Sequence, residues 1–255
     1  MTHTIAVAGK GGVGKTTVCG MIVDYLVKNR KTPILVVDAD ANSNLNEVLG
    51  VEAPVTLGEI REEMAHAEKA GETIPAGMTK ADYADFRFRD APAEEDDFDM
   101  LIMGRTQGSG CYCFVNSLLQ SQLQKYYKNY RYTVIDNEAG MEHIARGILP
   151  PVDTLFLVSD CSRRGIETVG RIAAMIRDLN VSHGRMELIV NRSPEETLNP
   201  GIMEEIEKQG LTLAGVLPHD DSIYDADCNG EPSSKIPDSS PVKQVLWKIL
   251  KDRDI

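Results

Sequence analysis

The sequence predicts an α/β protein with a mostly parallel, doubly wound sheet of about seven or eight strands and helices on both faces. Short apolar, β-branched runs alternate with longer helical patterns along the chain. Most of the short runs are continuously hydrophobic, as expected for strands that are buried on both faces. The chain has 255 residues, of which 42% are hydrophobic, so we expect a single domain over residues 1–255.

The elements follow in order. The expected strands are Ile5–Ala8, Ile34–Asp38, Met100–Gly104, Tyr132–Asp136, Thr154–Ser159, Met186–Asn191 and Leu213–Leu217. The helical patterns between them are Thr16–Asn29, Asn116–Asn129, Arg164–Leu179, Pro200–Gln209 and Pro241–Lys251. Residues 56–99 fit this alternation poorly. We interpret them as a variable surface insertion that holds one helix, Leu57–Ala70, followed by a polar stretch.

The net charge of −12 bears on possible partners. An acidic surface repels phosphate backbones and anionic lipid, so we expect no nucleic-acid partner and no membrane partner. The sequence contains no apolar run of about 18 residues and no secretory signal pattern. An odd number of cysteines then indicates reduced thiols and a cytoplasmic protein. These are Cys19, Cys111, Cys113, Cys161 and Cys228.

Gly9–Thr17 fits the phosphate-loop pattern G-x-x-x-x-G-K-[ST], between the first expected strand and the first expected helix. Glycines let backbone N–H groups turn inward around phosphate oxygens. The helix N-terminus adds a partial positive charge. We expect Lys15 on the β- and γ-phosphates and the Thr16 hydroxyl on Mg²⁺. The sequence thus predicts a P-loop NTPase, and the expected nucleotide-binding residues are Gly11, Gly12, Val13, Gly14, Lys15, Thr16 and Thr17.

A second lysine, Lys10, stands where the ordinary phosphate-loop pattern requires none. The segment Lys10–Thr16 resembles the deviant Walker A motif of the MinD/ParA/nitrogenase-iron-protein class. The resemblance implies a homodimer in which two ATP molecules are held between two chains, with Lys10 reaching the partner's nucleotide. It also implies an ATPase whose catalytic residues include Lys10 and Lys15.

Aspartates end two of the expected strands. Asp38 ends the second expected strand, Asp40 follows it, and Asp136 ends the fourth. Carboxylates at the carboxyl ends of parallel strands face the ligand crevice. Similarity to the class implies that Asp38 lies near Mg²⁺, that Asp40 positions the attacking water, and that Asp136 holds a Mg²⁺-bound water. The alternative for Asp38 and Asp40 is helix capping.

The segment after Asp136 departs from the wider class, which has Asp-x-Pro there; this chain has Asn137 and Glu138. Residues 136–143 instead resemble the CooC-type ATPases, which are nickel-insertion factors for carbon monoxide dehydrogenase and related enzymes. Gly140 is then expected to donate its N–H to the γ-phosphate.

Two further strand ends are candidates for binding the nucleobase. In the class, an Asn at the position of Asn191 reads adenine through its side-chain amide, whose donor and acceptor suit an adenine edge. We expect Pro218 to pack beside the base. The alternative for Asn191 is an ordinary turn residue.

Cys111 and Cys113 form a Cys-x-Cys pair flanked by glycines. Two thiolates do not complete a metal site, and the simplest completion is the same pair from a second chain. Zn²⁺, Ni²⁺ and Cu⁺ all suit thiolates, and a redox pair or incidental thiols are the alternatives. The CooC family has such a pair at its dimer interface, where it binds nickel.

The last expected helix carries one apolar stripe, with lysines off it. The stripe consists of Val242, Val245, Leu246, Ile249 and Leu250. We expect this helix to dock on the sheet; a membrane-targeting helix of the MinD type is the alternative.

Together these resemblances imply an ATP-dependent nickel metallochaperone. It would load nickel into a carbon monoxide dehydrogenase or acetyl-CoA synthase, its partner, and its cofactors would be ATP, Mg²⁺ and Ni²⁺, with Zn²⁺ binding in vitro. The alternative is a MinD/ParA-like positioning switch that binds membrane or DNA. An iron-protein-like reductase would need two well-separated cysteines per chain, whereas this pair is adjacent.

Overall fold

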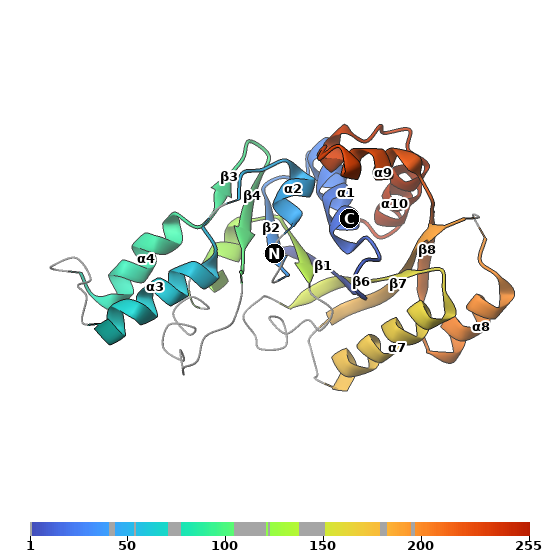
Figure 1. Ribbon diagram of the computed structural model, residues 1–255, viewed down its shortest axis with the longest axis horizontal. Coiled ribbons are helices and arrows are strands. Elements are labelled where there is room, and N and C mark those ends of the chain that lie inside the picture. The colour runs from blue at the N-terminus through green and yellow to red at the C-terminus, as the bar shows by residue number, and fades with distance from the viewer. Residues whose placement is uncertain are drawn as a thin grey trace.

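The computed structural model describes residues 2–40, 44–53, 55–70, 78–104, 121, 123–137, 151–178, 183–194 and 197–255. Within these residues one sheet has the strand order β3-β4-β2-β5-β1-β6-β7-β8 (Figure 1). Its strands are β1 (His3–Gly9), β2 (Ile34–Ala39), β3 (Ala93–Glu94), β4 (Phe98–Ile102), β5 (Tyr132–Asn137), β6 (Val152–Asp160), β7 (His183–Ser193) and β8 (Leu213–Pro218).

The strand arrangement confirms the predicted fold class. Every pairing is parallel except that of the short edge strand β3 with β4. Six of the seven expected strands lie within observed ones, and Met100–Gly104 overlaps β4 but runs two residues past its end. The sequence did not predict β3. β1 lies between β5 and β6, so the carboxyl ends of β1, β2, β5, β6 and β7 meet at one edge of the sheet. Ligand sites of doubly wound sheets form at this edge.

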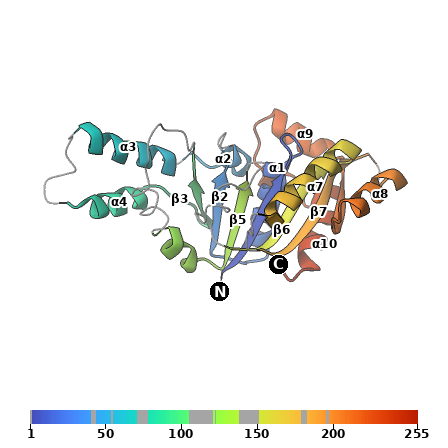
Figure 2. The ribbon, with the colours of Figure 1, turned by 90° about the horizontal axis from the view of Figure 1, so that it is seen from below.

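Helices cover both faces of the sheet (Figures 1 and 2). On one face lie α1 (Lys15–Lys28), α2 (Leu45–Leu49), α9 (Asp221–Cys228) and α10 (Pro241–Lys251). On the other lie α3 (Leu57–Ala70), α4 (Lys80–Arg89), α7 (Arg163–Asp178) and α8 (Pro200–Lys208). Successive residues of a strand point to opposite faces of the sheet. Ile5 and Val7 therefore pack in the core on the α1 side, and Ala6 and Ala8 pack in the core on the α7 side.

The helices α3 and α4 contact each other and extend past the β3 edge of the sheet (Figure 2). The bounds of α3 match the expected helix, but α4 was not anticipated. A capping box between Thr79 and Asp82 starts α4. Arg87 on α4 donates to Glu63 on α3 with an Nη2–Oε2 distance of 2.7 Å. Phe88 is buried in the core of this face. Of the expected helix Asn116–Asn129, residues 116–120 and 122 lie outside the described residues. Residues 121 and 123–126 are helical, as expected, and a 3₁₀ turn, η1 (Tyr127–Asn129), follows them.

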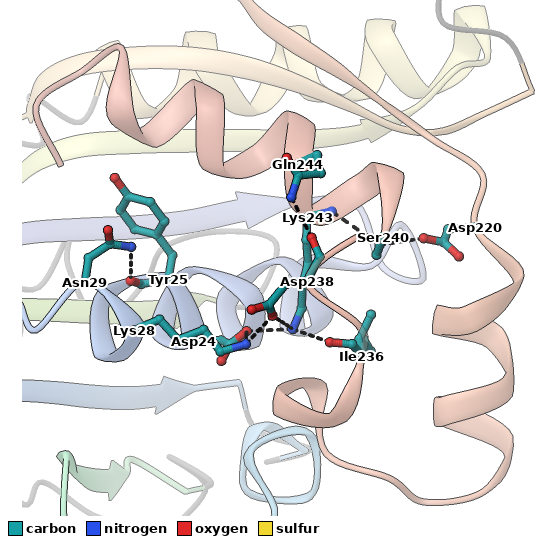
Figure 3. A network of polar contacts seen from close by, with 10 residues as sticks. All are labelled: Asp24, Tyr25, Lys28, Asn29, Asp220, Ile236, Asp238, Ser240, Lys243 and Gln244. Atoms are coloured by element: carbon teal, nitrogen blue, oxygen red, sulfur yellow. Dashed lines mark hydrogen bonds and ion pairs between the residues drawn. The ribbon is translucent and has the colours of Figure 1, made fainter.

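The helix α10 docks on the sheet through its apolar stripe, as expected. Lys243, which the sequence places off that stripe, is nevertheless fully buried. Its Nζ lies 2.6 Å from Oδ2 of Asp24 on α1 and donates to the Ile236 carbonyl oxygen at 2.7 Å (Figure 3). Lys28 also contacts Asp24, at 3.2 Å. A buried ion pair thus fixes α10 to the helix that follows the phosphate loop.

None of the helices in the described part of the chain combines the length and the apolar character that crossing a bilayer requires.

Candidate nucleotide site

The phosphate loop runs from the end of β1 to the start of α1. Gly14 caps α1 with φ at 90°, and a Cβ atom on it would lie 2.6 Å from Nδ2 of Asn191, so this position needs glycine. Lys15 is buried, and its Nζ donates to the Lys10 carbonyl oxygen at 3.4 Å. Lys10 itself is exposed, which leaves its side chain open to a second chain.

Asp38 and Asp136 end neighbouring strands and stand opposite each other in the register of β2 and β5. They are 0% and 1% exposed. Burial raises the pKa of Asp38 to about 6 and the pKa of Asp136 to about 7. At Asp136 a hydrogen bond from Thr16 and the charge of Lys15 oppose the rise, whereas the charge of Asp38 adds to it.

The backbone holds the Asp38 carboxylate on both oxygens. Oδ1 accepts from the Asp40 N–H at 3.0 Å, and Oδ2 accepts from the Leu45 N–H at 3.0 Å. Both hydrogen bonds oppose the effect of burial on the Asp38 pKa. Asp38 thus ties the end of β2 to the start of α2, a contact of the kind that the capping alternative expected. Asp40 is half-buried beside it.

The surroundings of Asp136 fit a magnesium ion. Its Oδ1 atom is buried and has no hydrogen-bond partner among the residues that the structure describes. Thr16 bonds the same carboxylate. Mg²⁺ takes carboxylate, hydroxyl and water oxygens, and it bridges to phosphates at such sites. The arrangement therefore suits a divalent cation between Asp136 and Thr16, at the start of α1.

Two side chains at the end of β7 donate hydrogen bonds to carbonyl oxygens of the phosphate loop. The Asn191 Nδ2 donates to the Val13 carbonyl oxygen at 2.8 Å, and the Arg192 Nη1 donates to the Gly12 carbonyl oxygen at 3.1 Å. The Asn191 Oδ1 accepts from the Arg192 N–H at 2.9 Å. A carboxamide has two N–H donors and two acceptor lone pairs, so Asn191 keeps one of each for a base edge.

Four predicted nucleotide-binding residues line one pocket of about 390 Å³ beside this loop: Gly14, Thr17, Asn191 and Pro218. Arg192 and residues of α9 also line the pocket. The sequence did not predict these residues as nucleotide-binding. Among them Tyr224 is 65% exposed, so an aromatic ring stands open at the rim. An Asp220 N-cap with a bond from the Ser222 N–H starts α9.

Three predicted site residues lie outside the described residues: Cys111, Cys113 and Gly140. Their roles stay predictions. In the described part of the chain, no group of three or more His, Cys, Asp or Glu side chains could hold a metal ion.

Comparison with known proteins bears on the family. Residues 4–233 match the model of the CobQ/CobB/MinD/ParA nucleotide binding domain. The chain belongs to this nucleotide-binding family. Over 247 residues it is 41% identical to an uncharacterised ATP-binding protein of Methanocaldococcus jannaschii, and the match covers 96% of each chain.

Two other similarities are more distant. The carbon monoxide dehydrogenase accessory protein CooC of Rhodospirillum rubrum is 30% identical over 242 residues, which cover 89% of this chain and 87% of that one. The solved ParA family ATPase of Chlorobium tepidum aligns with a TM-score of 0.70 at 17% identity, over 97% and 96% of the two chains. This structural match confirms the fold.

Proposed function

We propose that this protein is an ATP-dependent nickel-binding maturation factor that loads nickel into a carbon monoxide dehydrogenase or acetyl-CoA synthase type enzyme. ATP draws two copies of the chain together. Cys111 and Cys113 of both copies then form one four-thiolate site, and nickel is the cargo of that site. Such a site accepts Zn²⁺ as well as Ni²⁺ because thiolates are soft ligands.

The observation that carries this proposal is the similarity to CooC across most of both chains. It coincides with a Cys-x-Cys pair in this sequence. The exposed Lys10 supports the dimer, because an exposed lysine at the start of a phosphate loop can contact a nucleotide bound to a second copy.

The nucleotide site supplies the switch. The loop N–H groups and Lys15 would bind the phosphates. Thr16 would hold Mg²⁺, with Asp38 near the ion and Asp136 holding one of its bound waters. Mg²⁺ contributes neutralisation of charge on the β- and γ-phosphates. Asp40 would orient a water whose oxygen bonds to the γ-phosphorus while the bond to the β–γ bridging oxygen breaks. ADP leaves, and the protons of the water go to the phosphate product and to solvent. Hydrolysis then removes the γ-phosphate that holds the two copies together, so the dimer dissociates and the cysteine pairs separate.

The test is an anaerobic Ni²⁺ titration of the reduced protein in the presence of Mg-ATP, followed by thiolate-to-nickel charge-transfer absorption. The proposal predicts one Ni²⁺ per two chains and loss of binding in the double variant Cys111→Ser/Cys113→Ser. Cys228→Ser is the matched control, because Cys228 is a free, exposed thiol that does not belong to the Cys-x-Cys pair. Equal binding by the double variant and the control would refute the metal site.

The second candidate is a MinD/ParA-like positioning switch, which family membership favours equally. It predicts ATP-dependent co-sedimentation with anionic liposomes or DNA, unchanged by Cys111→Ser/Cys113→Ser. The docking of α10 counts against the membrane version, since release of the helix would expose its buried apolar face and break the ion pair of Lys243 with Asp24. Co-sedimentation that needs ATP but no cysteine would replace the first proposal with this one.

A further inference from the structure

Two consecutive carbonyl groups of the phosphate loop are held from outside. The Gly12 oxygen accepts from the guanidinium of Arg192, and the Val13 oxygen accepts from the amide of Asn191. Both donors come from the end of β7, a strand separated from β1 by β6. The loop is therefore fixed by a third element besides the strand before it and the helix after it.

These two contacts also fix the direction of N–H groups in the phosphate loop, because the geometry of a peptide unit links each carbonyl to the next N–H. In a trans peptide the carbonyl oxygen and the N–H of the next residue point in opposite directions. When the oxygens of Gly12 and Val13 point toward β7, the N–H groups of Val13 and Gly14 point away from it. Inward-pointing N–H groups of successive loop residues are the donors that cradle a phosphate.

Arg192 has a backbone conformation that its residue type disfavours. Its φ is 57°, in the left-handed region, where an L side chain is strained. The Asn191 Oδ1 accepts the Arg192 N–H, and Arg192 lies where the pairing of β7 with β8 is irregular, between Val190 and Ser193. Strained residues cluster where the surrounding structure needs their geometry, and from this position the guanidinium reaches the loop.

We propose that Asn191 and Arg192 form a clamp that sets the phosphate loop for nucleotide, with Arg192 as a positioning residue that acts through the Gly12 carbonyl. The inference rests on the proposed nucleotide function and assigns Arg192 a role in nucleotide binding. The clamp orients the Val13 and Gly14 donors before the phosphates arrive, so that less ordering is needed on binding.

The sharpest variant is Arg192→Gly, because glycine adopts a φ of 57° without strain and lacks the guanidinium. The clamp predicts an unchanged or higher Tm together with about tenfold weaker binding of Mg-ADP and of inorganic tripolyphosphate, about the effect of one hydrogen bond. Arg192→Lys, which keeps one cationic donor, should restore most of the affinity.

Arg30→Gly is the matched control. Arg30 is exposed, has a φ of 54° and stands at the far end of α1. Its substitution should relieve the same kind of strain and leave nucleotide affinity unchanged. In the nucleotide-free protein, ¹⁵N–¹H spectra should show amide shifts of the phosphate loop in the Arg192→Gly variant and not in the control.

The outcomes separate this inference from the proposed function. If the unmodified protein binds neither ATP nor ADP, the proposed function fails and the clamp fails with it. If it binds nucleotide and Arg192→Gly binds equally well, the clamp alone is refuted. A fall in Tm in Arg192→Gly that accounts for the weaker binding would show a structural role and would also refute the clamp.

Discussion

The substitution Asp136→Asn should stabilise the nucleotide-free protein while it removes the group that we assign to Mg²⁺. Asp136 is 1% exposed, and burial raises its pKa from 3.8 to about 7. A buried carboxyl with a raised pKa favours folding while it is protonated and disfavours it once it is ionised. Asparagine keeps nearly the same shape and stays neutral at every pH.

The magnitude follows from the pKa shift. The difference between 3.8 and about 7 is about three units, and each unit corresponds to about 1.4 kcal/mol. The stabilising effect of protonated Asp136 is complete below pH 3.8 and is lost as the pH rises through about 7. The advantage of Asp136→Asn should therefore be about 2 kcal/mol at pH 5.5 and about 4 kcal/mol at pH 8.

The assay is urea unfolding at both pH values, in EDTA and without nucleotide. Asp178→Asn, at an exposed aspartate that ends α7, is the control and should follow the unmodified protein. Addition of Mg-ATP should stabilise the unmodified protein and the control much more than Asp136→Asn. An Asp136→Asn variant that is no more stable at pH 8 than at pH 5.5, relative to the control, would refute the reasoning.

Three further substitutions test other contacts. Lys243→Met should lower the free energy of unfolding by about 3 kcal/mol, measured in urea, because it leaves the Asp24 carboxylate buried with its charge only partly compensated; a loss below 1 kcal/mol would contradict this. Gly14→Ala should weaken ATP binding at least about tenfold in a calorimetric titration, since the new Cβ would collide with Asn191, and unchanged affinity would count against it. Lys10→Ala should abolish ATP-dependent dimerisation in analytical ultracentrifugation without lowering Tm, because the side chain is exposed; ATP-driven dimers of the variant would remove Lys10 from the interface.

The sheet could be predicted because its strands are continuous apolar runs, which are a strong signal when a strand is buried on both faces. Shorter elements gave weaker signals. β3 has two residues, and its Glu94 belongs to an acidic run that is typical of a solvated surface. The helix α4 does carry a sequence signal, because Thr79 and Asp82 have the spacing of a capping box.

Contacts between elements that are distant along the chain could not be predicted from the sequence. Lys243 stands off the apolar stripe of its helix, and its buried environment depends on Asp24, 219 residues away along the chain. The guanidinium of Arg192 reaches Gly12 from a left-handed backbone conformation within the last residues of β7. Motif positions such as Lys15 and Asp136 could be found from spacing, whereas these partners required the folded chain.

The measurement that tests the central claim most directly is the Ni²⁺ affinity of the reduced protein with and without Mg-ATP, with its oligomeric state followed in parallel. If ATP-driven dimerisation joins the cysteine pairs, Mg-ATP should tighten Ni²⁺ binding at least about tenfold, and Ni²⁺ should tighten ATP binding by the same factor, because coupling is reciprocal. Both effects should vanish in Lys10→Ala. Equal Ni²⁺ affinity with and without Mg-ATP, in a protein that dimerises with ATP, would contradict the account.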